Sequence, residues 1–184
     1  QRFLNHNGLE VSTLSINDKK HLYVKFPFEQ YDSSRRVKNI IAHYDRVADS
    51  PGANDNSLAV FLLMNWAISL FKSDIKHNIR LIFSDGEEDY FGGVKSQGAF
   101  ALAEIFRKLK IVNEDFFIFD CLGRGDTPVL CKTLNCKVGN ESDKKNNLFL
   151  ESLCQLEDKA RSIIKKVNNG QCIELNSNFS DNAS

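Results

Sequence analysis

Residues 37–45 read VKNIIAHYD, an apolar run that ends in a histidine and an aspartate. The pattern recurs in residues 79–88, IRLIFSDGEE, which end in two glutamates, and in residues 116–120, FFIFD, which end in an aspartate. Short apolar runs rich in β-branched and aromatic residues, separated by segments of helix length, indicate buried strands of a largely parallel sheet. Ligands bind beyond the carboxyl ends of such strands. The sequence therefore predicts a metal site at one edge of a sheet, and with it a hydrolase.

The segments around these runs predict the rest of the fold. Residues 9–16 and 20–26 alternate apolar and polar side chains around the turn Asn17-Asp18-Lys19, which is typical of a hairpin at a sheet edge. Residues 49–56 are turn formers, and Asn54 or Asn56 is expected to cap the helix that follows. Apolar spacing predicts helices over residues 57–72, 95–110 and 147–168, and further strands over residues 129–131 and 171–175. We expect an α/β fold with three layers: a mostly parallel mixed β-sheet with helices on both faces.

Composition excludes several classes of protein. The 184 residues favour one domain, and 42% hydrophobic with 26% charged residues is an ordinary soluble composition. Lys and Arg together number 24, as do Asp and Glu, so the net charge of zero favours neither nucleic acid nor an acidic membrane as partner. The longest apolar stretch, residues 58–63, is far too short to span a bilayer.

The five cysteines have no zinc-finger spacing, and their odd number favours mostly free or buried thiols. Free thiols are typical of a reducing compartment, so the cysteines lean weakly towards a cytoplasmic location.

Four side chains at the predicted strand ends and in the turn-rich segment are candidate metal ligands: His43, Asp55, Glu88 and Asp120. Nitrogen and oxygen donors without thiolate suit Zn²⁺, Mn²⁺ or Co²⁺. Each residue alone also has a structural interpretation, such as a helix cap for Asp55, but a carboxylate that ends a buried run is costly unless it is paired. Their joint occurrence at three strand ends favours a metal site.

Two further residues complete the predicted site. Asp45, two positions after His43 on an extended chain, could accept the second imidazole N–H. Glu87 lies beside Glu88, so that one carboxylate can bind metal while Glu87 is left as general base for a metal-bound water.

The chain resembles the co-catalytic dizinc exopeptidases, a family that includes bacterial leucine aminopeptidases and has glutaminyl cyclases as close relatives. The resemblance rests on residues 39–45 (NIIAHYD) with 50–56 (SPGANDN), on residues 82–88 (IFSDGEE) and on residues 117–120 (FIFD). Residues 179–184 (FSDNAS) resemble more weakly the family's late Ser-Asp-His segment, with Asn182 where His is commoner.

The resemblance implies a role for each candidate residue. His43 and Asp120 would bind one zinc ion, Asp55 would bridge two, and Glu88 would bind the second. Glu87 would activate the water and later protonate the leaving amine, while Asp45 would support His43. The family often has a cis peptide bond after the bridging aspartate. The expected substrate is a peptide with a free N-terminus.

One family ligand is missing, because the second zinc ion also takes a late histidine and no histidine of this chain follows Asp120. We expect residues 1–184 to form a single zinc-exopeptidase-like catalytic domain that lacks its C-terminal part. Two zinc ions belong to the complete site, and one or none is compatible with this chain.

Several functions remain open at this point. A zinc-dependent aminopeptidase is the leading hypothesis, and a carboxypeptidase could use the same metal ligands. A glutaminyl cyclase is the alternative among related enzymes, although retention of His43 and Asp45 counts against it. An inactive metal-binding or interaction domain is the alternative outside enzymes, and the missing late histidine favours it.

Overall fold

The computed structural model describes residues 1–89, 92–111, 114–123, 129–132, 144–167 and 173–176. The chain divides into two compact units, Gln1–Arg124 and Gly125–Ser184, and each is described by itself. The first unit has five strands: β1 (Glu10–Ile16), β2 (Lys19–Lys25), β3 (Lys38–His43), β4 (Ile79–Ser84) and β5 (Asp115–Ile118). Its α-helices are α1 (Arg2–His6), α2 (Leu58–Phe71) and α3 (Gly98–Lys108).

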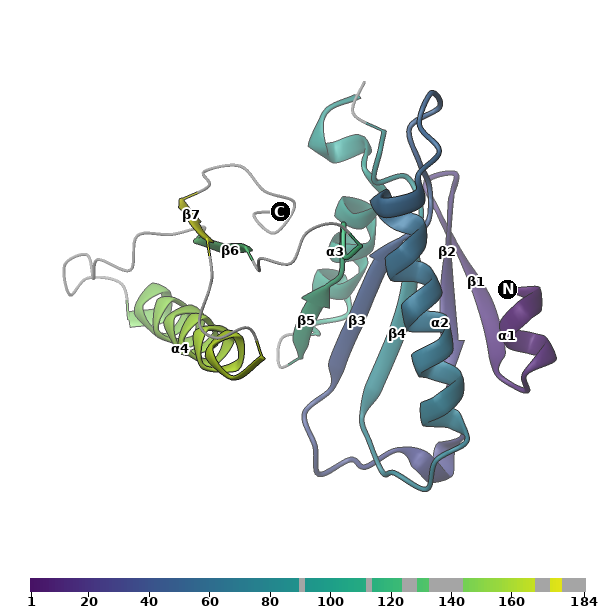
Figure 1. The fold of residues 1–184 in the computed structure, drawn as a ribbon, viewed down its shortest axis with the longest axis horizontal. Coiled ribbons are helices and arrows are strands. Elements are labelled where there is room, and N and C mark those ends of the chain that lie inside the picture. The colour runs from purple at the N-terminus through teal and green to yellow at the C-terminus, as the bar shows by residue number, and fades with distance from the viewer. Residues whose placement is uncertain (90–91, 112–113, 124–128, 133–143, 168–172, 177–184) are drawn as a thin grey trace. The chain divides into compact units, whose positions relative to one another are not determined.

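The five strands form one mixed sheet in the order β1-β2-β4-β3-β5 (Figure 1). β1 pairs with β2, and β2 with β4, in antiparallel fashion. β3 lies between β4 and β5 and is parallel to both, so the three strands of the sequence motifs are direct neighbours. Helices α2 and α3 lie on opposite faces of the sheet. The α/β fold with a mixed sheet and helices on both faces is thus confirmed.

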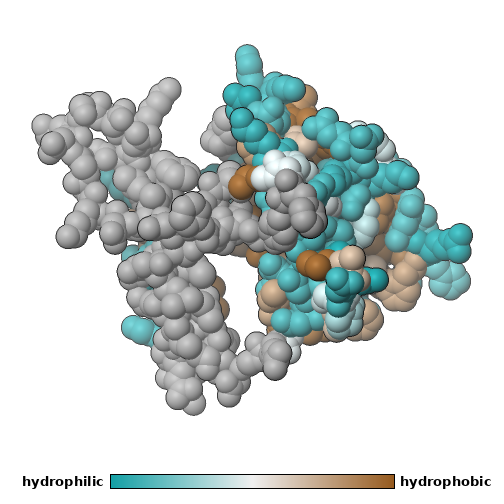
Figure 2. Space-filling model, turned by 90° about the horizontal axis from the view of Figure 1, so that it is seen from above, coloured by the Kyte–Doolittle hydropathy of each residue, from teal (hydrophilic) through white to brown (hydrophobic). Residues whose placement is uncertain are grey.

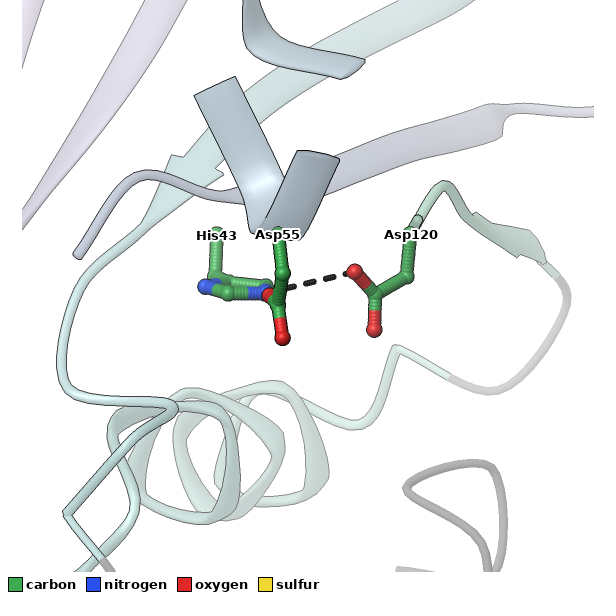
Figure 3. Close-up of side chains that lie close together, drawn as sticks. All are labelled: His43, Asp55 and Asp120. Atoms are coloured by element: carbon green, nitrogen blue, oxygen red, sulfur yellow. Dashed lines mark ion pairs between the residues drawn. The ribbon is translucent and has the colours of Figure 1, made fainter. Parts of the chain in front are cut away.

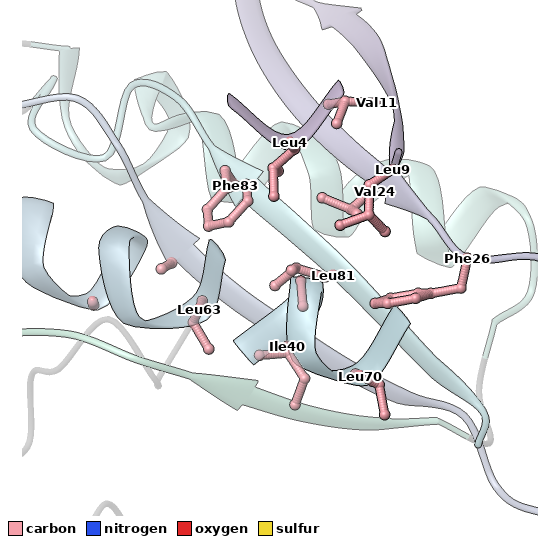
Figure 4. Close-up of a cluster of buried hydrophobic side chains, with 13 residues drawn as sticks. Leu4, Leu9, Val11, Val24, Phe26, Ile40, Leu63, Leu70, Leu81 and Phe83 are labelled. Carbon is pink, nitrogen blue, oxygen red and sulfur yellow. The ribbon is translucent and has the colours of Figure 1, made fainter. Parts of the chain in front are cut away.

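The hydrophobic core lies between the sheet and helices α1 and α2 (Figure 4). Alternate residues of β3 and β4 point into it, because successive side chains of a strand face opposite sides of the sheet. Helix α2 contributes residues at helical spacing, as its apolar pattern predicts. The buried members are Leu4, Leu9, Val11, Val24, Phe26, Ile40, Ala42, Ala59, Leu63, Ala67, Leu70, Leu81 and Phe83.

The predicted hairpin forms at the sheet edge. Ile16 of β1 pairs with Lys19 of β2, so Asn17 and Asp18 make a two-residue loop. Their φ angles are 46° and 65°, the left-handed values that the tightest hairpin turns require at both central positions. Asn and Asp adopt such values more readily than other residues with a side chain, which explains why the chain turns here.

The predicted helix cap is wrong. Ser57 occupies the position before α2 and makes no capping hydrogen bond with its side chain. Asn56 instead donates its amide to the carbonyl oxygen of Phe119, and Asn54 accepts a hydrogen bond from the backbone of Gly123. Both asparagines therefore bond to the segment that follows β5, which is distant in sequence and could not be seen from local pattern.

His77 is a buried histidine whose charge state couples stability to pH. Its ring packs edge-on against Phe26 and Tyr31, and its Nδ1 accepts the backbone N–H of Ile79. Burial lowers the pKa of His77 below its ordinary value of 6.5. Because the unfolded chain then binds more protons than the folded one, the stability from this group is present above pH 6.5 and is lost as the pH falls.

We therefore expect the free energy of unfolding to fall by up to about 1.4 kcal/mol per pH unit below pH 6.5 because of this residue alone. Urea unfolding of the metal-free protein at pH 7.5 and 5.5 measures the loss. The variant His77→Gln should lose less stability over the same interval. An equal loss in the two proteins would contradict the assignment.

The second unit contains β6 (Val129–Lys132), α4 (Lys144–Val167) and β7 (Ile173–Asn176). β6 and β7 pair in parallel, and all three elements overlap the predicted ones. Cys154 of α4 is disulfide-bonded, so this cysteine is not the free thiol that the odd count favours. Cys121 of the first unit is a free, exposed thiol. A disulfide is typical of an oxidising compartment, which removes the support for a cytoplasmic location.

Within the described ranges, no helix has the length and hydrophobicity needed to cross a membrane. On the face drawn in Figure 2, hydrophobic side chains are interspersed with hydrophilic ones. Scattered exposure of this kind is normal for a protein surface.

Candidate metal centre

The carboxyl ends of three neighbouring strands place the predicted ligands at one edge of the sheet. His43 is the last residue of β3 and pairs with Ser84, the last residue of β4. Phe119, directly after β5, still donates its N–H to the carbonyl oxygen of Ile41. Asp120 therefore leaves the sheet beside His43, and the loop after β4 begins at the same edge.

His43, Asp55 and Asp120 form the first cluster of donor atoms (Figure 3). The Nε2 atom of His43 lies 3.0 Å from Oδ1 of Asp55 and 3.4 Å from Oδ1 of Asp120. The histidine side chain is only 4% exposed, whereas the two carboxylates are 47% and 35% exposed. The two carboxyl groups are partly exposed, but the Oδ1 atoms that approach His43 are buried, so one buried nitrogen and two buried oxygens converge.

His43, Glu87 and Glu88 form a second cluster. One donor atom from each residue lies within 4.8 Å of the others, and the same limit holds in the first cluster. All the predicted ligands and the predicted base are therefore near His43, which both clusters share. The other three histidines lie elsewhere: His6 on α1, His21 in β2, and His77 just before β4.

Asp45 anchors the Glu87–Glu88 segment and also faces His43. Its Oδ1 accepts the backbone N–H of Glu87 at 3.1 Å, and its Oδ2 accepts that of Glu88 at 2.9 Å. The distance from Oδ1 to His43 Nδ1 is 3.6 Å, longer than an ordinary hydrogen bond. The spacing of two residues predicted the contact with histidine but gave no sign of the backbone bonds.

The charge state of Asp45 follows from these partners. Burial alone would raise the pKa of Asp45, but His43 and the backbone N–H groups of Glu88 and Glu87 outweigh it and lower the pKa to about 2. Asp45 is therefore ionised at neutral pH and can hold both amides.

The loop that carries Glu87 and Glu88 has further supports that sequence analysis missed. Gln97 donates its side-chain amide to the carbonyl oxygen of Glu87 at 2.7 Å, and Gly98 donates its backbone N–H to Gly86 at 3.0 Å. The β1–β2 hairpin contributes three more hydrogen bonds: Lys19 Nζ to Asp89, Lys20 N to the Asp85 side chain, and Asp85 N to His21 Nδ1. The loop is thus fixed by backbone and side-chain bonds from three elements.

Substitution of Gly98 tests how closely the start of α3 packs against the loop that carries Glu87 and Glu88. A Cβ atom at this position would lie 1.8 Å from the carbonyl oxygen of Asp85 and 2.9 Å from Cε1 of His21. We expect Gly98→Ala to lower the free energy of unfolding by about 3 kcal/mol, since the backbone must move to admit the methyl group. Ala99→Gly is the control, because Ala99 is exposed on the same helix and only the low helix propensity of glycine opposes the change, at about 1 kcal/mol. Equal losses of stability in urea unfolding would contradict the close packing.

The electrostatics of the cluster favour a cation. Burial disfavours the charged imidazolium of His43, yet Asp120, Asp45 and Glu87 together outweigh it and raise the pKa of His43 to about 10. Contact with His43 is also the main cause of the lowered pKa of Asp120. Carboxylates gathered around one imidazole therefore create a strongly negative site that holds positive charge.

The residues present fit a divalent metal ion. His43 Nε2, Asp55 Oδ1 and Asp120 Oδ1 are buried atoms without a well-formed hydrogen bond to any part of the chain that the structure describes. Polar atoms buried in this way need a partner. One imidazole nitrogen with carboxylate oxygens is a donor set that suits Zn²⁺ and its neighbours Mn²⁺ and Co²⁺.

The peptide bond between Asp55 and Asn56 is cis, as the family resemblance implies. The predicted late segment, residues 179–184 with Asn182, lies outside the described residues.

Three solved structures illustrate the similarity of this fold to known proteins. A glutaminyl cyclase of Porphyromonas gingivalis matches with a TM-score of 0.62 at 14% identity, over 99% of this chain and 66% of that one. The LapA aminopeptidase of Legionella pneumophila matches with a TM-score of 0.58 at 16% identity, over 94% of this chain and 44% of that one. A Macrostomum lignano glutaminyl cyclase gives 0.58 at 12% identity, over 95% of this chain and 60% of that one.

These TM-scores show a shared fold, and the chain spans between 44% and 66% of the length of the three proteins. No curated protein matches the chain significantly in sequence. The sequence model of peptidase family M28, however, matches residues 26–182, which include every predicted site residue. The resemblance to metal-dependent exopeptidases and their cyclase relatives is thereby confirmed, and the chain belongs to peptidase family M28.

Proposed function

We propose that the protein is a zinc-dependent aminopeptidase that removes residues from the free N-terminus of peptides. The observation that carries the proposal is the convergence of Asp55 and Asp120, and of Glu87 and Glu88, on the single buried imidazole of His43. Membership of peptidase family M28 supports peptide hydrolysis in general, and the donor set supports zinc.

Each residue has a distinct part in the proposed reaction. His43 and Asp120 would hold one zinc ion, Asp55 would bridge to a second, and Glu88 would bind that second ion. Zinc, when bound, would polarise the substrate carbonyl and lower the pKa of a water molecule. Glu87 would take the proton from the attacking water and pass it to the leaving amine.

Asp45 would hold Glu87 and Glu88 in position for these roles. Its two oxygens bond to consecutive backbone N–H groups, so the side chains of Glu87 and Glu88 start from a fixed backbone. A base must lie within hydrogen-bond reach of the proton that it takes, and a fixed backbone limits how far Glu87 can stray.

Glutaminyl cyclisation is the second candidate, because two of the three solved structures described above are glutaminyl cyclases. The family model that matches the chain is that of a peptidase family, which favours peptide hydrolysis over cyclisation.

An assay with two substrates separates these functions. The protein, dialysed against chelator and reloaded with one or two equivalents of Zn²⁺, is incubated with a set of aminoacyl-anilides and with peptides that begin in Gln. Zinc-dependent release of the aniline is the expected result. Cyclisation of the Gln peptides without aniline release would favour the cyclase, and bound zinc with neither reaction would indicate a metal-binding domain without activity.

A further inference from the structure

Two asparagines flank Asp55 and link it to the segment that carries Asp120. Asn56 donates its Nδ2 to the carbonyl oxygen of Phe119 at 2.8 Å. Asn54 accepts the backbone N–H of Gly123 at 2.8 Å through its Oδ1. The residues before and after one candidate ligand therefore each bond to a residue close to the other, and the two bonds have opposite polarity.

The packing at both bonds leaves little freedom. Asn56 is 1% exposed, and in the described part of the chain only its Nδ2 has a partner. A Cβ atom on Gly123 would lie 2.2 Å from Leu58 Cδ2 and 2.9 Å from Asn54 Oδ1, so the segment approaches the turn as closely as its backbone allows. Burial of Asn56 and the close approach of Gly123 therefore both restrict how the two segments can move relative to each other.

These bonds oppose a specific electrostatic force. The Oδ1 atoms of Asp55 and Asp120 both face Nε2 of His43 and lie within 4.8 Å of each other, and like charges at that distance repel. His43 attracts both side chains and offsets part of this repulsion, but it does not fix the backbone segments that carry the two carboxylates. Neutral amide side chains can hold the two segments together without adding charge to the site.

We infer that Asn54 and Asn56 are positioning residues that set the separation of Asp55 and Asp120 before a metal ion binds. The inference rests on the proposed metal site but not on the proposed reaction. Replacing a group that orients a metal ligand through a hydrogen bond typically lowers metal affinity by about 10- to 100-fold. Neither asparagine contacts the ion in this arrangement, so its effect acts through the two aspartates.

The opposite polarity of the bonds gives a matched test. Asn54→Asp keeps an oxygen that accepts from Gly123, whereas Asn56→Asp replaces a donor with an oxygen that faces the carbonyl of Phe119. The two substitutions add the same charge on either side of Asp55. Zinc affinity, measured by competition with a chromogenic chelator, should therefore fall at least fivefold more in Asn56→Asp than in Asn54→Asp.

Asn54→Ala removes the acceptor without adding charge and should weaken zinc binding about tenfold. This variant also tests the inference if Asn56→Asp does not fold, because Asn54 is only partly buried and its replacement disturbs the core less. Asn65→Asp is the control: this asparagine bonds to Phe61 on the exposed side of α2, and its replacement should leave zinc affinity unchanged.

A second readout separates positioning from stability. Co²⁺ bound to the wild type and to Asn54→Ala should differ in the intensity of its visible d–d bands, since these report ligand geometry. Unchanged bands and zinc affinity within twofold in Asn54→Ala would overturn the inference, as would equal losses in the two aspartate variants. A wild type that binds zinc but releases no aniline overturns only the peptidase, and one that binds no zinc overturns both.

Discussion

Glu87→Gln is expected to lower kcat for aminoacyl-anilides by about 10²- to 10⁴-fold while leaving bound zinc in place. Glutamine has the size of glutamate and keeps an oxygen, but it cannot take a proton from water. The backbone of this residue is held by Asp45 at its N–H and by Gln97 at its carbonyl oxygen, so the loop should keep its position in the variant. The loss should therefore appear in the chemical step alone.

The neighbouring residue provides the comparison. Glu88→Gln makes the same change one position later and should lower zinc content, because the proposal assigns Glu88 to the metal. Steady-state kinetics and metal content measured on the same samples distinguish the two roles. Near-normal turnover in Glu87→Gln would remove Glu87 as the base.

His43→Ala is expected to abolish stoichiometric zinc binding. His43 is the one residue shared by both clusters of donor atoms, so its loss weakens both at once. It also removes the positive charge that offsets Asp120, Asp45 and Glu87 in the metal-free protein. The four remaining carboxylates would then repel one another and spread apart.

Atomic emission after dialysis against metal-free buffer measures the retained zinc. His6→Ala is the matched control, since His6 is exposed on α1 and belongs to neither cluster. Wild-type zinc stoichiometry in His43→Ala, with the control unchanged, would refute the assignment of His43 as a ligand.

The elements that position the site could be predicted because their signals are local. β4 runs over Ile79–Ser84, the limits given by its apolar run, and the carboxyl ends of β3, β4 and β5 meet as parallel strands must. Donor residues directly after such runs could then be grouped without coordinates.

The missed features depend on contacts between distant segments. The local sequence around Asn56 predicts a helix cap, but the hydrogen-bond partner of its side chain, Phe119, lies 63 residues away. The bonds from Asp45 to the backbone of Glu87 and Glu88 span more than 40 residues and leave no trace in side-chain pattern. Gln97 bonds to a carbonyl group, which every residue has, so its partner could not be singled out.

The contacts between the N-terminal hairpin and the glutamate loop have a practical consequence. The family match begins at residue 26, yet Lys19, Lys20 and His21 all bond to the segment Asp85–Asp89. The start of the family match at residue 26 therefore does not mark the first residue that supports the site. A fragment trimmed to residues 26–182 would lack the three hydrogen bonds that the hairpin makes to this loop, and its inactivity would say nothing about the chemistry of the longer chain.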